Sequence, residues 1–412
     1  MITLKTYRQF HRTHCRQCGH CLTACPYMTL SHKTAIREIQ HLQSGHMTPR
    51  MLKKCVGCMA CNGVCPKGLK PYDLMVLCWY DRYQEQELPI RVSYLTPHGR
   101  PHFRSDLVRH LGPRHRRMVQ KWRHARPDGG RAFYPGCNLL ALPQLLDTPL
   151  LSDLTIIGDW NLCCGEMYYR LGALDAVKAI ARSLTHYFHE HPVEELMVGC
   201  PACYRMLTKI LPERFETALP TRITFFAHYI KEEMMAHPHA HSLEPEGRVG
   251  LHHPCHTRLN PNPIQDDLLA FLNAINWHPV MWDRGAPVCC GAAAGANRHH
   301  LTDMARVARK TLIQAKKAGI KTLVTYCAGC QLHFSLWRWS VPGAPTVRHF
   351  LELATRAIGH DVQPKLSFMT HHLVKTGLRR LLPRYLSPRR FTVDTHLPPT
   401  KKRDDSGFSG SH

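Results

Sequence analysis

Apolar side chains recur every three or four positions between residues 31 and 47, which is the spacing of an amphipathic helix. Ser31 is the first residue of this segment and is a favourable N-cap residue. The apolar positions are Ala35, Ile36, Ile39 and Leu42. We therefore expect a capped helix in the N-terminal part of the chain.

Further along, short apolar strands alternate with longer amphipathic helices. The segments 155–158, 278–282 and 322–326 are predicted strands, and 174–188 and 303–318 have helical periodicity. Gly319 is suited to end the second of these helices. The inner face of that helix is predicted to consist of Met304, Val307, Ala308, Thr311, Leu312 and Ala315. This alternation indicates a parallel-sheet α/β core.

The alternating pattern occurs twice, so the chain contains an internal repeat. Residues 131–137 match 248–255, 162–165 match 288–291, and 196–203 match 323–330. The offset is 118 residues at the first cysteine, 126 at an adjacent cysteine pair and 127 at the last pair. We expect two copies of one domain, with the cysteines at the carboxyl ends of strands, where such sheets bind ligands.

Two compact cysteine runs precede the repeat. Each reads Cys-x2-Cys-x2-Cys-x3-Cys-Pro, at 15–26 and at 55–66. In this bacterial ferredoxin run, three thiolates bind one four-iron cubane and the fourth binds the neighbouring cluster. A structural zinc site is the alternative, but it has no use for a third cysteine and a Cys-Pro in each run. One cubane is thus assigned Cys15, Cys18, Cys21 and Cys65, and the other Cys55, Cys58, Cys61 and Cys25.

The repeat carries ten more cysteines in two longer groups. Side chains of adjacent cysteines diverge unless the loop is forced, and Gly165 and Gly291 supply backbone freedom directly after each adjacent pair. Five gathered thiolates would suit an opened, non-cubic iron–sulfur centre, although spacing alone does not specify one. The groups are Cys137, Cys163, Cys164, Cys200 and Cys203, then Cys255, Cys289, Cys290, Cys327 and Cys330.

The expected fold class is a multidomain α+β protein. A helical ferredoxin-like domain is expected at 1–80, a basic connector at 81–130, repeated α/β domains at 131–245 and 246–360, and a basic tail at 361–412.

Composition indicates the cellular location of the protein and the kind of partner it binds. We find no export signal and no apolar run of the roughly 18 residues that a membrane span needs, so we expect a reducing, cytoplasmic location. The net charge of +24 falls when ligating thiolates are counted, because an oxidised cubane with four thiolates carries about −2. The remaining excess favours an anionic membrane surface or acidic partners, and no nucleic-acid-binding motif is present.

Two segments concentrate the positive charge. Residues 98–127 hold nine Lys or Arg and five His against one acid, Asp106, and we interpret them as a solvated linker. Beyond about residue 365, basic and apolar residues predict an amphipathic helix, broken at Pro383, that lies on an anionic membrane or a partner. From Pro398 onward the composition indicates a disordered tail.

The cysteine spacings resemble a known family. With Cys-x25-Cys-Cys-x35-Cys-x2-Cys and Cys-x33-Cys-Cys-x36-Cys-x2-Cys, the two copies resemble the CCG domains of heterodisulfide reductase. The N-terminal region resembles the two-cubane partner of that enzyme, so the chain resembles a fusion of the two, as in its membrane-linked type. It also resembles the iron–sulfur subunits of anaerobic glycerol-3-phosphate dehydrogenase and glycolate oxidase. The resemblance covers about residues 10–355.

The resemblance implies two CCG-type (non-cubane) four-iron clusters, one on each group of five repeat cysteines, besides the two [4Fe-4S] cubanes. It implies an oxidoreductase subunit that passes electrons from the cubanes to the CCG clusters for disulfide or thiol chemistry. The reaction site is then the cluster on Cys255, Cys289, Cys290, Cys327 and Cys330. The dehydrogenase-type subunits have lost part of the first constellation, which this chain keeps; this favours the disulfide hypothesis.

The alternative is a non-catalytic electron-transfer subunit that links a flavin dehydrogenase of the glycolate or glycerol-3-phosphate type to quinone or a membrane cytochrome. The expected partners are a flavoprotein and a membrane cytochrome or quinone-reactive subunit, with peripheral contact to the inner face of the membrane through the basic tail.

Three kinds of residue have weaker signals. His252, His253 and His256 flank Cys255 and could donate protons, although chance placement is the simpler explanation in a chain with 31 His. Glu166 is either an acid or a surface carboxylate, and Cys78 is expected to be a buried small hydrophobe. No Gly-rich dinucleotide fingerprint follows a strand, so neither flavin nor NAD is expected on this chain.

Overall fold

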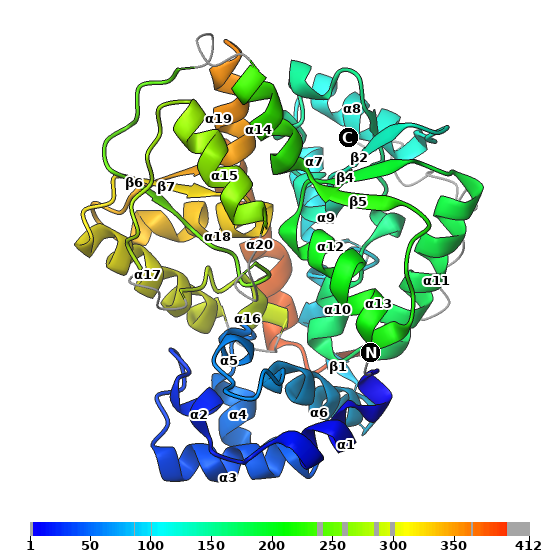
Figure 1. Ribbon diagram of the computed structural model, residues 1–412, viewed down its shortest axis with the longest axis vertical. Helices are drawn as coiled ribbons and strands as arrows, with labels where there is room; N and C mark the ends of the chain where they lie inside the picture. The colour runs from blue at the N-terminus through cyan, green and yellow to red at the C-terminus, as the bar shows by residue number, and fades with distance from the viewer. Residues whose placement is uncertain are drawn as a thin grey trace.

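The computed structural model describes residues 3–85, 87–99, 101–236, 242–257, 263–283, 288–296, 301–363 and 366–393. A helical domain lies at one end, and two α/β domains lie side by side above it (Figure 1). We call these the N-terminal domain, the first repeat domain and the second repeat domain. The architecture confirms the predicted α+β class.

The N-terminal domain is built from short helices joined by cysteine-bearing loops. The hydroxyl of Ser31 accepts a hydrogen bond from the Thr34 backbone N–H at 3.3 Å, which confirms the predicted cap. Ala35, Ile39 and Leu42 are buried behind it, as expected for one helix face. The helices are α1 (Leu4–His14), α2 (His20–Thr23), α3 (His32–Gln43), α4 (Pro49–Lys54), α5 (Ala60–Gly63) and α6 (Pro71–Glu85).

The first repeat domain contains a parallel sheet with the strand order β3-β2-β4-β5. The strands are β2 (Arg131–Tyr134), β3 (Thr155–Ile156), β4 (Glu195–Val198) and β5 (Arg222–Phe225). The helices are α9 (Gly136–Leu139), α10 (Glu166–Leu171), α11 (Leu174–Glu190), α12 (Pro201–Arg205), α13 (Leu211–Phe215) and α14 (Phe226–Ala236).

The second repeat domain has a parallel sheet with the order β6-β7-β8, which repeats the relation of β2, β4 and β5. The strands are β6 (Val249–Leu251), β7 (Thr322–Thr325) and β8 (Thr346–His349). The helices are α15 (Pro263–Ala274), α16 (Ala292–Ala296), α17 (Leu301–Lys317), α18 (Ala328–Trp337) and α19 (Phe350–Ala357). The predicted inner face of α17 is buried throughout, and Gly319 follows the helix with φ +74°.

The strand predicted at 278–282 is wrong. Only one bridge forms there, between Gly250 and Val280. Pro279 lacks an N–H to donate to a strand ladder. In addition, the Trp282 indole N–H donates to the backbone carbonyl of Leu251 at 2.9 Å, so a side chain satisfies that carbonyl.

The interpretation of 98–127 as a solvated linker is also wrong. The segment forms α7 (Phe103–Arg109) and α8 (Pro113–His124), which bury Leu107, Val119 and Trp122. Asp106, the lone acid, is buried and accepts a hydrogen bond from the Tyr94 hydroxyl at 2.9 Å. Charge counting missed these helices because their apolar positions are few and widely spaced.

The C-terminal basic segment forms α20 (Leu366–Leu386), followed by β9 (Arg390–Phe391). The expected break at Pro383 is wrong, because α20 runs through that residue and packs against α7, α18 and η1 (Ile90–Tyr94). Pro383 lies in the last turn, where it removes only one backbone hydrogen bond. β9 pairs with β1 (Leu88–Pro89), and residues 394–412, including the predicted disordered tail, lie outside the described residues.

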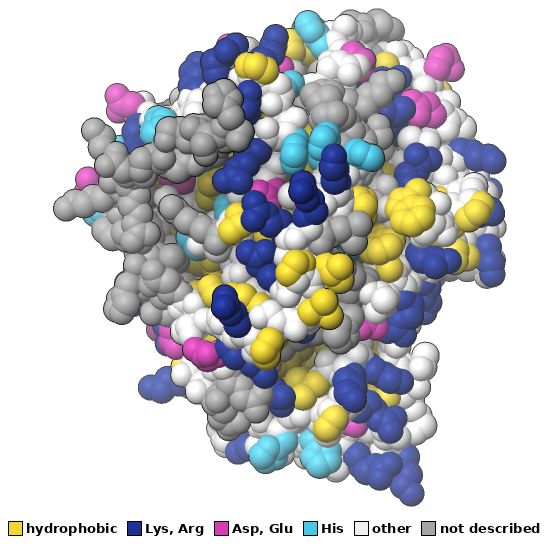
Figure 2. All heavy atoms as spheres, turned by 180° about the vertical axis from the view of Figure 1, so that it is seen from behind, with side chains coloured by type: hydrophobic (Ala, Val, Ile, Leu, Met, Phe, Trp, Pro, Cys, Tyr) yellow, Lys and Arg dark blue, Asp and Glu magenta, His cyan; other side chains and the backbone are white. Residues whose placement is uncertain are grey.

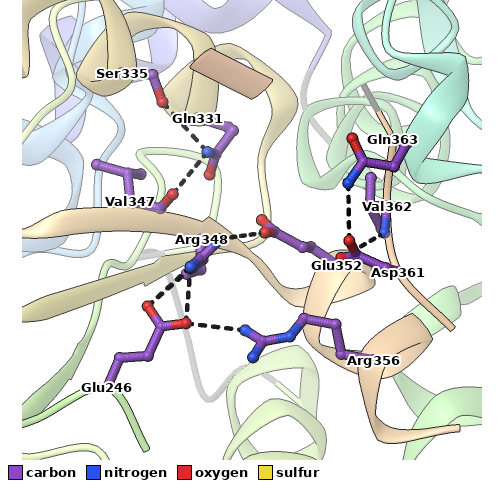
Figure 3. A network of polar contacts seen from close by, with 10 residues as sticks. All are labelled: Glu246, Gln331, Ser335, Val347, Arg348, Glu352, Arg356, Asp361, Val362 and Gln363. Atoms are coloured by element: carbon purple, nitrogen blue, oxygen red, sulfur yellow. Dashed lines mark hydrogen bonds and ion pairs between the residues drawn. The ribbon is translucent and has the colours of Figure 1, made fainter. Parts of the chain in front are cut away.

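An ion-pair network closes the edge of the second repeat domain (Figure 3). The Arg348 guanidinium on β8 donates to both carboxylate oxygens of Glu246, at 2.7 and 2.9 Å, and to Glu352 at 2.5 Å. Arg356 donates to Glu246 at 3.0 Å. Burial opposes the ionisation of Glu246, but the two arginines together lower its pKa. These contacts connect the segment before β6 with β8 and α19.

The N-terminal domain contacts the two repeat domains in different ways. Asp73 on α6 is buried and accepts hydrogen bonds from the Tyr169 hydroxyl at 2.8 Å and from Arg214 Nε at 2.9 Å, both in the first repeat domain. The two domains also share one hydrophobic core. The contact with the second repeat domain consists of a hydrogen bond from Lys310 Nζ to the Pro26 carbonyl at 2.8 Å and a small apolar cluster. The members of this cluster are Val56, Cys58 and Ala60 on one side and Cys289, Ala294, Met304 and Val307 on the other.

Candidate iron–sulfur sites

The two compact runs form loops with the same backbone geometry. The second and fourth residues after the first cysteine have positive φ in both: Gln17 and Gly19, then Gly57 and Met59. In the first loop, the Gln17 N–H points to Cys15 Sγ at 3.4 Å. Such turns direct backbone N–H groups toward the cysteine sulfurs, and hydrogen bonds of this kind tune iron–sulfur clusters.

The tertiary structure brings the eight compact-run cysteines together in two crossed sets. One cavity is lined by Cys15, Cys18, Cys21 and Cys65 together with Pro66, and we call these four cysteines the first compact set. Cys55 and Cys61 lie close enough to Cys25 for a thiolate on Cys25 to raise their pKa values, after the larger effect of burial. The second compact set is Cys25, Cys55, Cys58 and Cys61.

The ten repeat cysteines gather in two sets of five at the carboxyl ends of the strands. Thiol hydrogen bonds link Cys163 to Cys137 and Cys164, and Cys203 to Cys164 and Cys200. We call these five the first CCG set. In the second CCG set, the same bonds link Cys290 to Cys289 and Cys330, and Cys330 to Cys327. Cys255 completes this set, because its charge interacts with Cys290 and Cys289.

The glycine after each adjacent pair has the expected role. Gly165 and Gly291 have φ of +85° and +84°, a region that favours glycine. The N–H of Gly165 points to Cys163 Sγ at 3.3 Å, and that of Gly291 to Cys289 Sγ at 3.4 Å. The turn thus folds the first cysteine of each pair back beside the second.

The second cysteine of each adjacent pair has a lowered pKa. Hydrogen bonds from Cys163 and Cys203 lower the pKa of Cys164 to about 7 despite burial. Equivalent bonds from Cys289 and Cys330 hold the pKa of Cys290 well below its ordinary value.

Three pairs of neighbouring cysteines place the four sets in a row. Cys21 of the first compact set lies close enough to Cys61 of the second for their charges to interact, and Cys58 has the same relation to Cys289. Cys200 and Cys327 of the two CCG sets are within hydrogen-bonding distance. The Cys58–Cys289 contact lies inside the apolar cluster between α5 and α16, which are neighbours in Figure 1.

A buried polar network surrounds Cys255. Arg170 Nη2 donates to Cys255 Sγ at 3.1 Å and lies 2.8 Å from His256 Nε2. The Glu166 side chain is only 12% exposed and pairs with Arg170 and with His256 Nε2, the latter at 3.0 Å, so the surface alternative for Glu166 is wrong. Burial opposes these charges, but Arg170 and His256 lower the pKa of Glu166 to about 2 and that of Cys255 to about 7.

No separate signal in the sequence marked Arg170. A comparison of the two copies could have found it, because Gly165 is followed by Glu-Met-Tyr-Tyr-Arg and Gly291 by Ala-Ala-Ala-Gly-Ala. Two of the predicted histidines have other contacts: His252 packs edge-on against Phe334, and His253 lies 3.4 Å from the Tyr326 hydroxyl.

Cys78 lies outside all four sets. It is buried in α6, as predicted, and its thiol donates to the Leu42 carbonyl at 3.8 Å. Burial raises its pKa to about 12.

Within the described ranges, no three His, Cys, Asp or Glu side chains are gathered tightly enough to hold a single metal ion. A four-iron cluster instead distributes its thiolates over separate irons. The all-thiolate composition of the four sets and the N–H groups directed at Cys15, Cys163 and Cys289 fit such clusters.

Models of two protein families match this chain. The 4Fe-4S dicluster domain matches residues 14–69, and the cysteine-rich domain, CCG, matches twice, at 132–208 and 249–335. The chain joins a 4Fe-4S dicluster domain to two CCG domains. These matches cover the N-terminal domain and both repeat domains and make the chain an iron–sulfur electron-transfer protein.

Two curated proteins are similar over most of this chain. A probable glycolate oxidase iron–sulfur subunit of Bacillus subtilis (strain 168) is 24% identical, with 84% of this chain and 94% of that protein covered. An uncharacterized iron–sulfur protein of Methanocaldococcus jannaschii is 21% identical, with 77% of this chain and 66% of that protein covered.

Proposed function

We propose that this chain is the electron-relay subunit of a larger oxidoreductase, with four cluster sites in one row. The order is the first compact set, the second compact set, the second CCG set and the first CCG set. The observation that carries this proposal is the proximity of three cysteine pairs, Cys21–Cys61, Cys58–Cys289 and Cys200–Cys327. The order does not follow the chain, because the second CCG set lies near the second compact set, through Cys289 and Cys58.

In this proposal the two compact sets each hold a [4Fe-4S] cubane and the two CCG sets each hold a four-iron CCG-type cluster. When bound, such clusters accept and release one electron at a time. The protein keeps water from the central step, since Cys58 and Cys289 are both buried among apolar side chains.

The similarity to a glycolate oxidase iron–sulfur subunit supports a flavoprotein as the electron donor and a quinone-reactive subunit or membrane cytochrome as the acceptor. Contact with the membrane surface would use the exposed residues of α20 and the segment after it. Among the described residues, no helix has the length and apolar character to cross a bilayer. Lys and Arg outnumber acidic side chains on the face drawn in Figure 2, which suits an anionic surface. The exposed residues include Lys375, Arg379, Leu382, Leu386 and Arg389.

Iron analysis and spin coupling test the relay. The anaerobically purified chain should carry about sixteen irons, four in each set. Cys58→Ala should remove about four of these irons. In the reduced protein it should also abolish the magnetic broadening of the second CCG signal by its cubane neighbour. Cys78→Ala is the matched control and should change neither quantity. A second CCG signal that stays equally broadened in an iron-depleted Cys58→Ala protein would contradict the proposed order.

A second candidate function is heterodisulfide reductase-like disulfide chemistry at the CCG sets. Two observations favour it: all ten CCG cysteines are present, and Cys200 and Cys327 bring the two sets into contact. The isolated chain should then reduce a disulfide with a reduced dye, and Cys289→Ser should abolish this turnover. A fully iron-loaded chain without such turnover would leave only the relay function.

A further inference from the structure

Arg170 is the one side chain of the described residues that we find joined to all three domains at the centre of the proposed relay. It belongs to α10 of the first repeat domain, and its side chain is only 2% exposed. Nη1 donates to the backbone carbonyl of Gly57, between Cys55 and Cys58 in the N-terminal domain. Nη2 donates to Cys255 Sγ in the second repeat domain at 3.1 Å.

The two CCG sets differ at this point. In the second set, the first cysteine receives a guanidinium hydrogen bond. In the first set, the corresponding Cys137 lies beside Asn138, and Arg104 Nε donates at 2.9 Å to the Asn138 side-chain oxygen. The guanidinium comes from the other copy of the repeat. Arg170 follows Gly165 in the first repeat domain, whereas the second repeat domain has Ala296 at the corresponding position. The second CCG set therefore receives a contact that its own repeat does not provide.

A buried positive charge that hydrogen-bonds to a ligand sulfur stabilises the more negative, reduced form of an iron–sulfur cluster. Glu166 acts in the opposite direction, because its buried carboxylate lies against the same guanidinium and against His256. The positive charge of Arg170 therefore contacts Cys255 Sγ directly, whereas the negative charge of Glu166 acts on it through Arg170 and His256.

We propose that Arg170 is a positioning residue that raises the reduction potential of the cluster held by the second CCG set, an inference that rests on the proposed relay. With clusters bound, the second compact set would supply one electron and the second CCG set would accept it, so that the cluster of the former would be oxidised and that of the latter reduced. Arg170 favours this direction by its charge, and its bond to Gly57 holds the two cysteine loops against each other.

The experiment is a redox titration of the anaerobic full-length chain, followed by electron paramagnetic resonance, with iron and sulfide counted for each variant. Arg170→Gln should move the potential of the second CCG signal to a more negative value. Arg170→Lys, which keeps the charge but loses the forked contact, should give a smaller shift in the same direction. Glu166→Gln removes the opposing charge and should move the potential to a more positive value.

Arg222→Gln is the matched control. It makes the same charge change in the first repeat domain, at an exposed side chain that pairs with Glu195 at the amino end of β5. It should leave the potential of every cluster unchanged.

If Arg170→Gln and Glu166→Gln shift the reduction potential in opposite directions, the effect comes from charge. A packing defect would have no reason to follow the sign of the charge that is removed. Unshifted potentials in iron-replete Arg170→Gln, or shifts of equal sign in both variants, would overturn the inference. If Arg170→Gln loses its iron, Arg170→Lys and Glu166→Gln decide the question. A wild-type chain without a reducible second CCG centre would instead refute the relay itself.

Discussion

Each repeat domain has its own parallel sheet and five-cysteine set, but the two domains contact the N-terminal domain differently. The first shares a hydrophobic core with it and adds a polar attachment, in which buried Asp73 accepts hydrogen bonds from Tyr169 and Arg214. The second has a smaller, apolar attachment around Cys58 and Cys289, beside a hydrogen bond from Lys310 to the Pro26 carbonyl. The buried ion pair fixes the orientation of the first repeat domain, whereas the apolar cluster keeps water from the Cys58–Cys289 step of the proposed relay.

The largest expected effect tests the polar attachment. Asp73→Ala removes the carboxylate that pairs with Arg214, and breaking such a buried pair costs about 3–5 kcal/mol. Met304→Ala in the apolar attachment should cost less, about 2–3 kcal/mol, because this residue is still 9% exposed. Chemical denaturation of the anaerobic protein measures both. Equal losses would mean that the two attachments do not differ in strength.

The two glycines after the cysteine pairs provide the next comparison. A Cβ at Gly291 would lie 2.7 Å from the Met304 carbonyl oxygen, whereas at Gly165 the nearest atom is 3.5 Å away. Gly165→Ala should therefore cost only the strain of positive φ, about 1–2 kcal/mol. Gly291→Ala should cost about 1–3 kcal/mol more because of overpacking. The iron content and melting temperature of each variant check this order, and a more damaging Gly165→Ala would contradict it.

The Glu246 network belongs to the second repeat domain and should make its stability depend on acid. The folded-state pKa of Glu246 is lowered, so its contribution is complete above the unfolded-state pKa and is lost as the pH falls through the folded value. Glu246→Gln should cost less than about 1 kcal/mol at pH 7, because the carboxylate is partly exposed. The difference from wild type should disappear once the pH is below the folded-state pKa of Glu246, as urea unfolding curves would show. A stability difference between Glu246→Gln and wild type that persists in acid would show that the substitution acts through packing instead.

The smallest effect concerns Arg104 in the first repeat domain. Its charge faces Cys137, but its hydrogen bond goes to Asn138, so it acts on the first CCG set without direct contact. Arg104→Lys keeps the charge and should shift the first CCG potential less than Arg170→Lys shifts the second. Redox titration of both CCG signals in each variant measures the two shifts. A larger shift for Arg104→Lys than for Arg170→Lys would contradict the proposed difference between the two CCG sets.

Much of the local structure was predictable. The Ser31 cap, the inner face of α17 and the glycine turns after Cys164 and Cys290 follow from short-range spacing, and the structure agrees with each. The predictions were wrong where contacts with distant parts of the chain outweigh the local composition. The basic segment 98–127 folds because α20 and the first repeat domain cover its few apolar residues.

The sequence by itself determined which three cysteines of each compact run can share a set, because the two-residue spacings limit where neighbouring thiols point. It also determined the repeat and its parallel sheets, through the alternation of strands and helices. Only the tertiary structure decided the order of the four sets and the partner of Cys255. Both depend on how surfaces about a hundred residues apart in the chain dock, as in the reach of Arg170 to Gly57 and Cys255.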